Sequence, residues 1–205
     1  MGIIQTTKQL RPREENDHYP TPRELVRAVL TEDYLDKLHH IFQTTHLNVL
    51  DPGAGNGVWG EVLHAVSPLS TVVGVERRKV PVPLHYASWH NDNFLQWSGR
   101  QPSFHLITGN PPYRYAEQFV RIGHSLLAEG GEIVFLLRLA FLESQKRSVG
   151  LWKDLPPYHV SVLGRRPSFT GDRRTDATAY MIAYWRKGSY SYTSLDWLDW
   201  SYDEH

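Results

Sequence analysis

Cysteine is absent from the 205 residues of this chain. Without it the chain cannot build a disulfide framework, a thiolate zinc site or a cysteine nucleophile. The sequence also lacks an apolar signal segment near its start and any apolar run of the roughly 20 residues that a membrane-spanning helix needs. We therefore expect a soluble cytoplasmic protein.

An excess of charge of either sign is missing as well, because 22 Lys and Arg balance 22 Asp and Glu. Any contact with nucleic acid must then come from a local basic patch. The eleven His show no spacing typical of metal ligands, so we predict no metal site. With 40% hydrophobic residues the chain can bury one core. We expect a flexible arm over residues 1–18, one domain over 19–187 and a C-terminal tail over 188–205.

Short apolar runs alternate with helical patterns along the chain. The runs predict strands at 47–50, 71–75, within 84–90, 104–107, 133–137, 160–163 and 179–185. Helices are predicted at 34–42, with Leu35, Leu38 and Ile41 inward, and from 59 to 66, with Trp59 on the apolar face. A further helix is predicted at 116–127, stopped by Gly130 and Gly131. This order predicts an α/β fold with a Rossmann-like, mostly parallel sheet, one antiparallel strand and helices on both faces. Ligands of such sheets collect beyond the carboxyl ends of the strands.

The stretch Tyr19-Pro20-Thr21-Pro22-Arg23-Glu24 has the sequence of a helix start. Thr21 is predicted as the N-cap, Pro22 as the first helical residue and Glu24 as the residue that closes a capping box.

A glycine-rich loop, Asp51-Pro52-Gly53-Ala54-Gly55-Asn56-Gly57, lies between a predicted strand and a predicted helix. Glycines permit positive φ and let a ligand approach the backbone closely. Taken alone, the loop fits a nucleotide-type cofactor, including a nicotinamide dinucleotide, or a tight turn. Glu76 ends the next strand, where its carboxylate could accept hydrogen bonds from two ribose hydroxyls.

The second motif is Thr108-Gly109-Asn110-Pro111-Pro112-Tyr113, which follows the apolar run 104–107. The two prolines stop the strand and leave a rigid tip that carries an amide, two carbonyls and an aromatic ring. A proline turn with a surface tyrosine would explain this tip alone. It would not explain the glycine loop upstream.

Together the two motifs resemble the S-adenosylmethionine-dependent methyltransferases that modify exocyclic amino groups, chiefly N6 of adenine in DNA. The resemblance implies the class I methyltransferase fold with a seven-stranded sheet, and S-adenosylmethionine as cofactor. It implies a cofactor site formed by Tyr19, Thr21, Pro22, Asp51, Pro52, Gly53, Ala54, Gly55, Gly57, Glu76, Asp92, Asn93, Phe94 and Asn110.

Three positions in that site carry specific roles or depart from the family pattern. By the resemblance, Asp92 would bond the amino group of the cofactor's adenine and Phe94 would pack on its ring. The family usually has an acidic residue directly before Phe-Leu, where this chain has Asn93.

The Asn-Pro-Pro-Tyr tip has the groups that chemistry at an adenine amine requires. The lone pair of N6 is delocalised into the ring, and acceptors opposite both N–H bonds would free it. The Asn110 side-chain oxygen and the Pro111 carbonyl can supply these acceptors, and Pro111 and Pro112 hold them rigid. Tyr113 would stack on the base, which must be flipped out of a duplex first. No general base is required.

A later segment, Gly164 to Phe169, resembles the family's Arg-Pro-x-Phe-type loop, whose aromatic residue packs on the flipped base. Phe169 is either that residue or an ordinary loop anchor. Arg165, Arg166 and Arg173 suit phosphate contacts, although each could also be a solvated surface charge.

The sequence leaves other substrates open. Larger members of the family carry a target-recognition domain, which we do not expect here, so the chain resembles the compact, phage-like members. Such a protein would read a very short site, methylate with little selectivity, or rely on a partner or a homodimer. Adenosine in RNA and glutamine amides in release factors are alternative substrates for the same tetrapeptide. A binding module that has lost catalysis is the non-enzyme alternative.

Overall fold

The computed structural model describes residues 20–99, 103–170, 175, 177–188 and 192–202. Two residues predicted to lie in the site, Tyr19 and Arg173, and the predicted arm over 1–18 fall outside these ranges.

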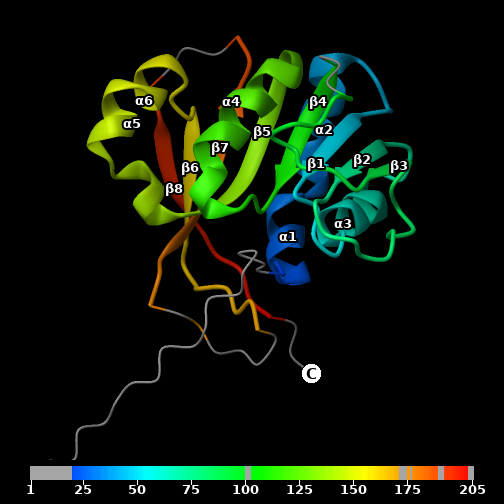
Figure 1. Cartoon of the computed structure of the whole chain (residues 1–205), viewed down its shortest axis with the longest axis horizontal. Coiled ribbons are helices and arrows are strands. Elements are labelled where there is room, and N and C mark those ends of the chain that lie inside the picture. The colour runs from blue at the N-terminus through cyan, green and yellow to red at the C-terminus, as the bar shows by residue number, and fades with distance from the viewer. Residues whose placement is uncertain (1–19, 100–102, 171–174, 176, 189–191, 203–205) are drawn as a thin grey trace, which may run out of the picture.

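Within the described ranges one eight-stranded sheet forms, with the strand order β3-β2-β1-β4-β5-β7-β6-β8 (Figure 1). Its strands are β1 (Asn48–Pro52), β2 (Thr71–Val75), β3 (Ser88–His90), β4 (Phe104–Gly109), β5 (Leu127–Arg138), β6 (His159–Leu163), β7 (Tyr180–Arg186) and β8 (Ser194–Leu198). β7 runs antiparallel to both of its neighbours, β5 and β6, and the other pairs are parallel. The mostly parallel sheet with one antiparallel strand is confirmed, but it has eight strands rather than seven. The eighth is β8, which comes from the predicted tail.

Helices cover both faces of the sheet (Figure 1). The α-helices are α1 (Arg23–Val29), α2 (Glu32–Phe42), α3 (Val58–Val66), α4 (Ala116–Leu126), α5 (Gln145–Val149) and α6 (Leu151–Asp154), with short 3-10 helices η1 (Tyr113–Tyr115) and η2 (Leu139–Leu142). Alternate residues of a strand point to opposite faces. Accordingly, Val49 packs in a core cluster with α1, α2 and α3, whereas Leu50 packs in a second cluster with α4 and α6.

Three local predictions were wrong. α1 begins at Arg23, and its N-cap is Pro22 without a side-chain cap bond, so Thr21 is not the N-cap. Ile41, expected to face inward, is 45% exposed. Gly130 and Gly131 do not stop α4, which ends at Leu126, but lie inside β5. Gly130 has a φ of +79°, and the pairing of β4 with β5 shifts register nearby.

The topology brings several strand ends to one edge of the sheet. β1, β2, β4 and β5 are mutually parallel, and β6 shares their direction because both β5 and β6 are antiparallel to β7. The loops after these five strands therefore leave the same edge. Across the described ranges, no helix is long and apolar enough to cross a membrane.

Candidate active site

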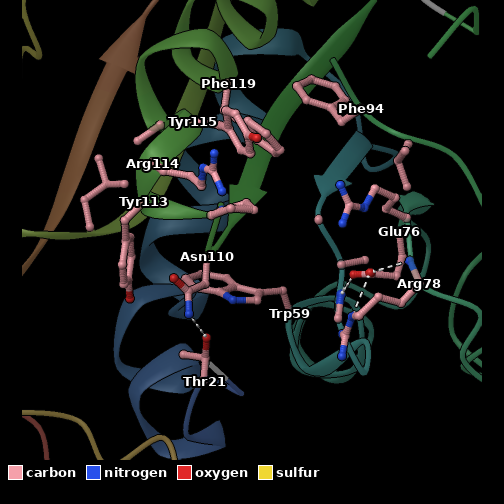
Figure 2. A pocket seen from close by; sticks show the side chains of 18 of the residues that line it. Thr21, Trp59, Glu76, Arg78, Phe94, Asn110, Tyr113, Arg114, Tyr115 and Phe119 are labelled. Carbon is pink, nitrogen blue, oxygen red and sulfur yellow. Dashed lines mark hydrogen bonds and ion pairs between the residues drawn. The ribbon is translucent and has the colours of Figure 1, made fainter. Parts of the chain in front are cut away.

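A cavity of about 840 Å³ lies at this carboxyl edge (Figure 2). Its volume is within the range of about 300–1,000 Å³ that is typical of small-molecule sites. The structure brings eleven predicted site residues to its wall: Thr21, Gly53, Ala54, Gly55, Glu76, Asp92, Asn93, Phe94, Asn110, Pro112 and Tyr113. The glycine loop and the Asn-Pro-Pro-Tyr tip, which are more than 50 residues apart in the sequence, thus share one cavity.

Hydrogen bonds to the end of β2 hold the glycine loop in place. The amide nitrogens of Gly53 and Ala54 donate to the Val75 carbonyl at 2.7 and 3.1 Å. Glu76 then uses both carboxylate oxygens. Oε2 accepts from the Gly55 amide at 2.8 Å, and Oε1 accepts from the backbone N and the Nε of Arg78 at 2.8 and 2.9 Å. The loop backbone and an acidic side chain therefore form one continuous wall.

Glycine is favoured at position 53 by the backbone conformation, because L side chains rarely adopt its positive φ. Gly53 has a φ of +74°, and a Cβ added to it would point at Phe119 and Pro112, each 3.6 Å away. Both of these residues line the cavity. A side chain at Gly53 would thus fill space that the cavity keeps open.

Asp51 does not line the cavity, although the sequence predicted a direct cofactor contact. It is 1% exposed, and the Tyr86 hydroxyl donates to its Oδ2 at 2.6 Å. The same hydroxyl accepts from the Gly60 amide at 3.1 Å, so Asp51 connects β1 to α3 through Tyr86. Burial raises the pKa of Asp51 to about 7; the bond from Tyr86 lowers it, and the charge of Glu76 raises it further.

Four other predicted residues, Pro22, Pro52, Gly57 and Pro111, are likewise not part of the cavity wall. Gly57 instead packs against its surroundings so closely that an added Cβ would lie 2.5 Å from Pro83. These residues shape the loops that carry the wall.

The Asn110 side chain is oriented by Thr21, which is 7% exposed. Asn110 Nδ2 donates to Thr21 Oγ1 at 3.2 Å. With Nδ2 held there, the amide oxygen faces the side of the cavity on which Tyr113 lies (Figure 2). Thr21 therefore positions the amide of the Asn-Pro-Pro-Tyr tip instead of capping α1.

Tyr113 is surrounded by further aromatic and cationic groups. The Arg138 guanidinium lies 4.8 Å from the centre of the Tyr113 ring, within cation–π range. The Tyr180 ring centre is 6.0 Å away. These neighbours restrict the position of the Tyr113 ring, and Arg138 lines the same cavity.

Of the two roles predicted for Phe169, a base contact and a loop anchor, its position fits the loop anchor. Phe169 does not line the cavity; it is 9% exposed and packs edge-on against Tyr180, with ring centres 5.2 Å apart. Arg165 and Arg166 are exposed on the same loop and do not line the cavity either. The ring of Phe169 is large and apolar, so burial against Tyr180 removes it from water more fully than a cavity wall would.

Sequence reasoning missed several wall residues: Trp59, Arg77, Arg78, Arg114, Tyr115, Phe119, Arg138 and Arg147. Trp59 was interpreted as part of the apolar face of its helix, and Phe119 lies in the helix that follows the second motif. The position of Arg138 at the carboxyl end of β5 was the available signal for that residue.

The cavity wall carries more positive than negative charge. Two acidic residues, Glu76 and Asp92, are outnumbered by five arginines, Arg77, Arg78, Arg114, Arg138 and Arg147. The wall therefore favours an anionic ligand.

This sheet, with its one antiparallel strand and a glycine loop after β1, is the class I S-adenosylmethionine-dependent methyltransferase fold. No family model and no curated protein matches the sequence.

Solved structures do match the fold. A protein from Listeria monocytogenes, assigned to the class I S-adenosylmethionine-dependent methyltransferases, has a TM-score of 0.71 and 14% identity, over 90% of this chain and 67% of that one. A modification subunit assigned to a type I restriction enzyme of Vibrio vulnificus has a TM-score of 0.59 and 16% identity, over 86% of this chain and 45% of that one. The plantazolicin methyltransferase BpumL, solved with a desmethyl-plantazolicin analogue and S-adenosylhomocysteine, has a TM-score of 0.54 and 13% identity, over 82% and 86%.

Proposed function

We propose that this protein transfers a methyl group from S-adenosylmethionine to the N6 amino group of adenine in DNA. One observation carries the proposal: the Asn110 side chain and the glycine loop line the same cavity. An amine-binding group and a cofactor loop on one cavity wall are what a direct methyl transfer requires.

The cavity fits S-adenosylmethionine. Gly53 leaves open the space that a side chain would fill, and Glu76 presents a carboxylate beside the loop. Phe94 and Asp92 line the wall and suit the adenine end of the cofactor. When bound, the cofactor supplies a methyl group activated by its sulfonium, so the protein has to position and polarise the acceptor amine.

The acceptor amine is held by the Asn-Pro-Pro-Tyr tip. The bond from Asn110 Nδ2 to Thr21 orients the amide, whose oxygen is the acceptor proposed for an incoming N–H. The Pro111 carbonyl is proposed as the second acceptor. Asn, unlike Asp, adds no negative charge beside a neutral base, and the adjacent prolines fix the geometry.

An extruded base would stack on Tyr113. Arg138 and Tyr180 restrict the Tyr113 ring before any base binds. A base can therefore stack on the ring without the entropy cost of ordering it. Base pairing hides N6, so a duplex target must be flipped at a cost of about a few kcal/mol. The five arginines of the wall suit the phosphates beside such a base.

DNA is favoured over other substrates by the Asn-Pro-Pro-Tyr tip, the basic wall and the likeness of the fold to a modification subunit assigned to a restriction enzyme. An RNA adenosine or a protein glutamine amide presents a similar amine and forms the alternative. BpumL, which was solved with a desmethyl-plantazolicin analogue, has the same fold, so the fold alone does not decide the substrate.

Tritiated S-adenosylmethionine incubated with unmethylated DNA, total RNA and a release factor tests the proposal. We expect label in DNA. Label confined to RNA or to the release factor would assign the alternative substrate. Binding of S-adenosylhomocysteine without transfer to any of the three would identify an inert module.

A further inference from the structure

The residues that follow β8 are bonded to the loop that follows β6. Figure 1 shows the two segments side by side below the sheet. The Gly164 amide donates to the Leu198 carbonyl at 3.0 Å, which extends the β6–β8 pairing by one bond. Trp200 Nε1 donates to the Arg165 carbonyl at 2.9 Å. The Ser168 amide donates to the Tyr202 hydroxyl at 2.7 Å.

Two of these contacts are made by a packed pair of rings, of which Trp200 is buried and Tyr202 is partly buried. Trp200 is 5% exposed and lies edge-on to Tyr202, with ring centres 5.0 Å apart. Two of the three bonds use side-chain atoms of this pair, and both bonds end on the backbone of the loop. We call Leu198, Trp200 and Tyr202 the C-terminal clip.

The clipped loop leads to the ring proposed to stack on the base. It leaves β6 at the same sheet edge as the Asn-Pro-Pro-Tyr tip. Phe169 in this loop packs on Tyr180, and Tyr180 packs near Tyr113. The loop also carries two exposed cations, Arg165 and Arg166, directly beside the clipped backbone.

We propose that Trp200 and Tyr202 are positioning residues for the nucleic-acid substrate: they fix loop 164–170 so that its arginines contact phosphate while Phe169 and Tyr180 support Tyr113. This inference rests on the proposed function. The clip acts through the loop and not on the cofactor, because none of its residues lines the cavity.

Two conservative variants test the inference. Tyr202→Phe removes the acceptor of the Ser168 amide and keeps the ring, and Trp200→Phe removes the donor to Arg165. Trp197→Phe is the matched control, since Trp197 belongs to the same segment but is 71% exposed. The assays measure KM for DNA and kcat at saturating cofactor, S-adenosylhomocysteine affinity, the melting temperature, and amide hydrogen exchange over residues 164–170.

For each clip variant we expect the KM for DNA to rise about threefold to tenfold, as the loss of one hydrogen bond predicts. Amide exchange over 164–170 should become faster, while kcat and S-adenosylhomocysteine affinity stay within twofold of the wild type. Trp197→Phe should change none of these quantities.

Three results would overturn the inference, and they are distinguishable. If the wild type transfers methyl to DNA and both clip variants keep its KM, the role proposed for the clip is wrong and the proposed function stands. If KM, cofactor affinity and melting temperature all deteriorate together, the two residues only stabilise the core. If the wild type transfers no methyl to DNA, the proposed function fails and the inference fails with it.

Discussion

The buried carboxyl of Asp51 makes the stability of the fold depend on pH. Its pKa is raised from 3.8 to about 7, mainly by burial. The folded state therefore holds a proton that the unfolded chain releases, so this group stabilises the fold most at low pH. Its contribution is lost as the pH rises through the folded pKa near 7. For these two pKa values, linkage predicts a loss of about 2–3 kcal/mol between pH 5 and pH 8.

Asp51→Asn removes the proton equilibrium and keeps an oxygen for the Tyr86 hydroxyl to bond. Urea unfolding of the wild type and of this variant, at intervals from pH 5 to pH 8, measures the difference. Relative to the wild type, the variant should gain about 2–3 kcal/mol across this range. Asp36→Asn makes the same charge change at an exposed position of α2 and should not show this gain. Parallel pH profiles for the wild type and Asp51→Asn would refute the account of Asp51.

Three further predictions concern separate parts of the molecule. Thr21→Val removes the acceptor of the Asn110 amide, so its kcat should fall about threefold to tenfold. Thr21→Ser keeps the hydroxyl and should keep the wild-type kcat. Unchanged turnover in Thr21→Val would contradict the role of Thr21. Glu76→Gln weakens charge-assisted bonds at the cofactor loop, and calorimetry should show an S-adenosylhomocysteine affinity about 10–100-fold lower. Glu132→Ala leaves Arg186 and the Tyr34 and Tyr158 hydroxyls without their buried acceptor, and denaturant unfolding should show a loss of about 3–5 kcal/mol with an unchanged KM for DNA.

The sequence predicted the elements that carry strong local signals. The apolar runs that became β2 and β4 and the amphipathic pattern of α4 were placed correctly, because buried strands and helices of this length have a distinct hydrophobic period. The two motifs were also placed on the correct strand ends, since parallel strands bring their carboxyl ends to one edge.

What the sequence did not predict depends on contacts between distant segments. β8 was missed because its residues are mostly exposed, and its pairing partner, β6, lies more than 30 residues upstream. A helix does begin near Thr21, at Arg23, but the Thr21 hydroxyl is bonded to Asn110, 89 residues away, and does not cap that helix.

The same reason explains the errors in the site. Asp51 has a motif position that suggests ligand contact. Its carboxylate is instead bonded by the hydroxyl of Tyr86, which lies in a segment that carries no motif. Phe169 and Tyr180 come together only when β6 and β7 pair, so the sequence could not show that the Phe169 ring is buried.

The central claim is that the Asn110 amide holds an adenine amine for methyl transfer. Mass spectrometry of nucleosides from DNA treated with the wild type and with Asn110→Ala tests it, with S-adenosylhomocysteine affinity measured in parallel. The account predicts N6-methyladenine from the wild type and none from Asn110→Ala, with the two affinities within a few-fold of each other. Wild-type yields from Asn110→Ala, or a methyl group on another atom of the DNA, would contradict it.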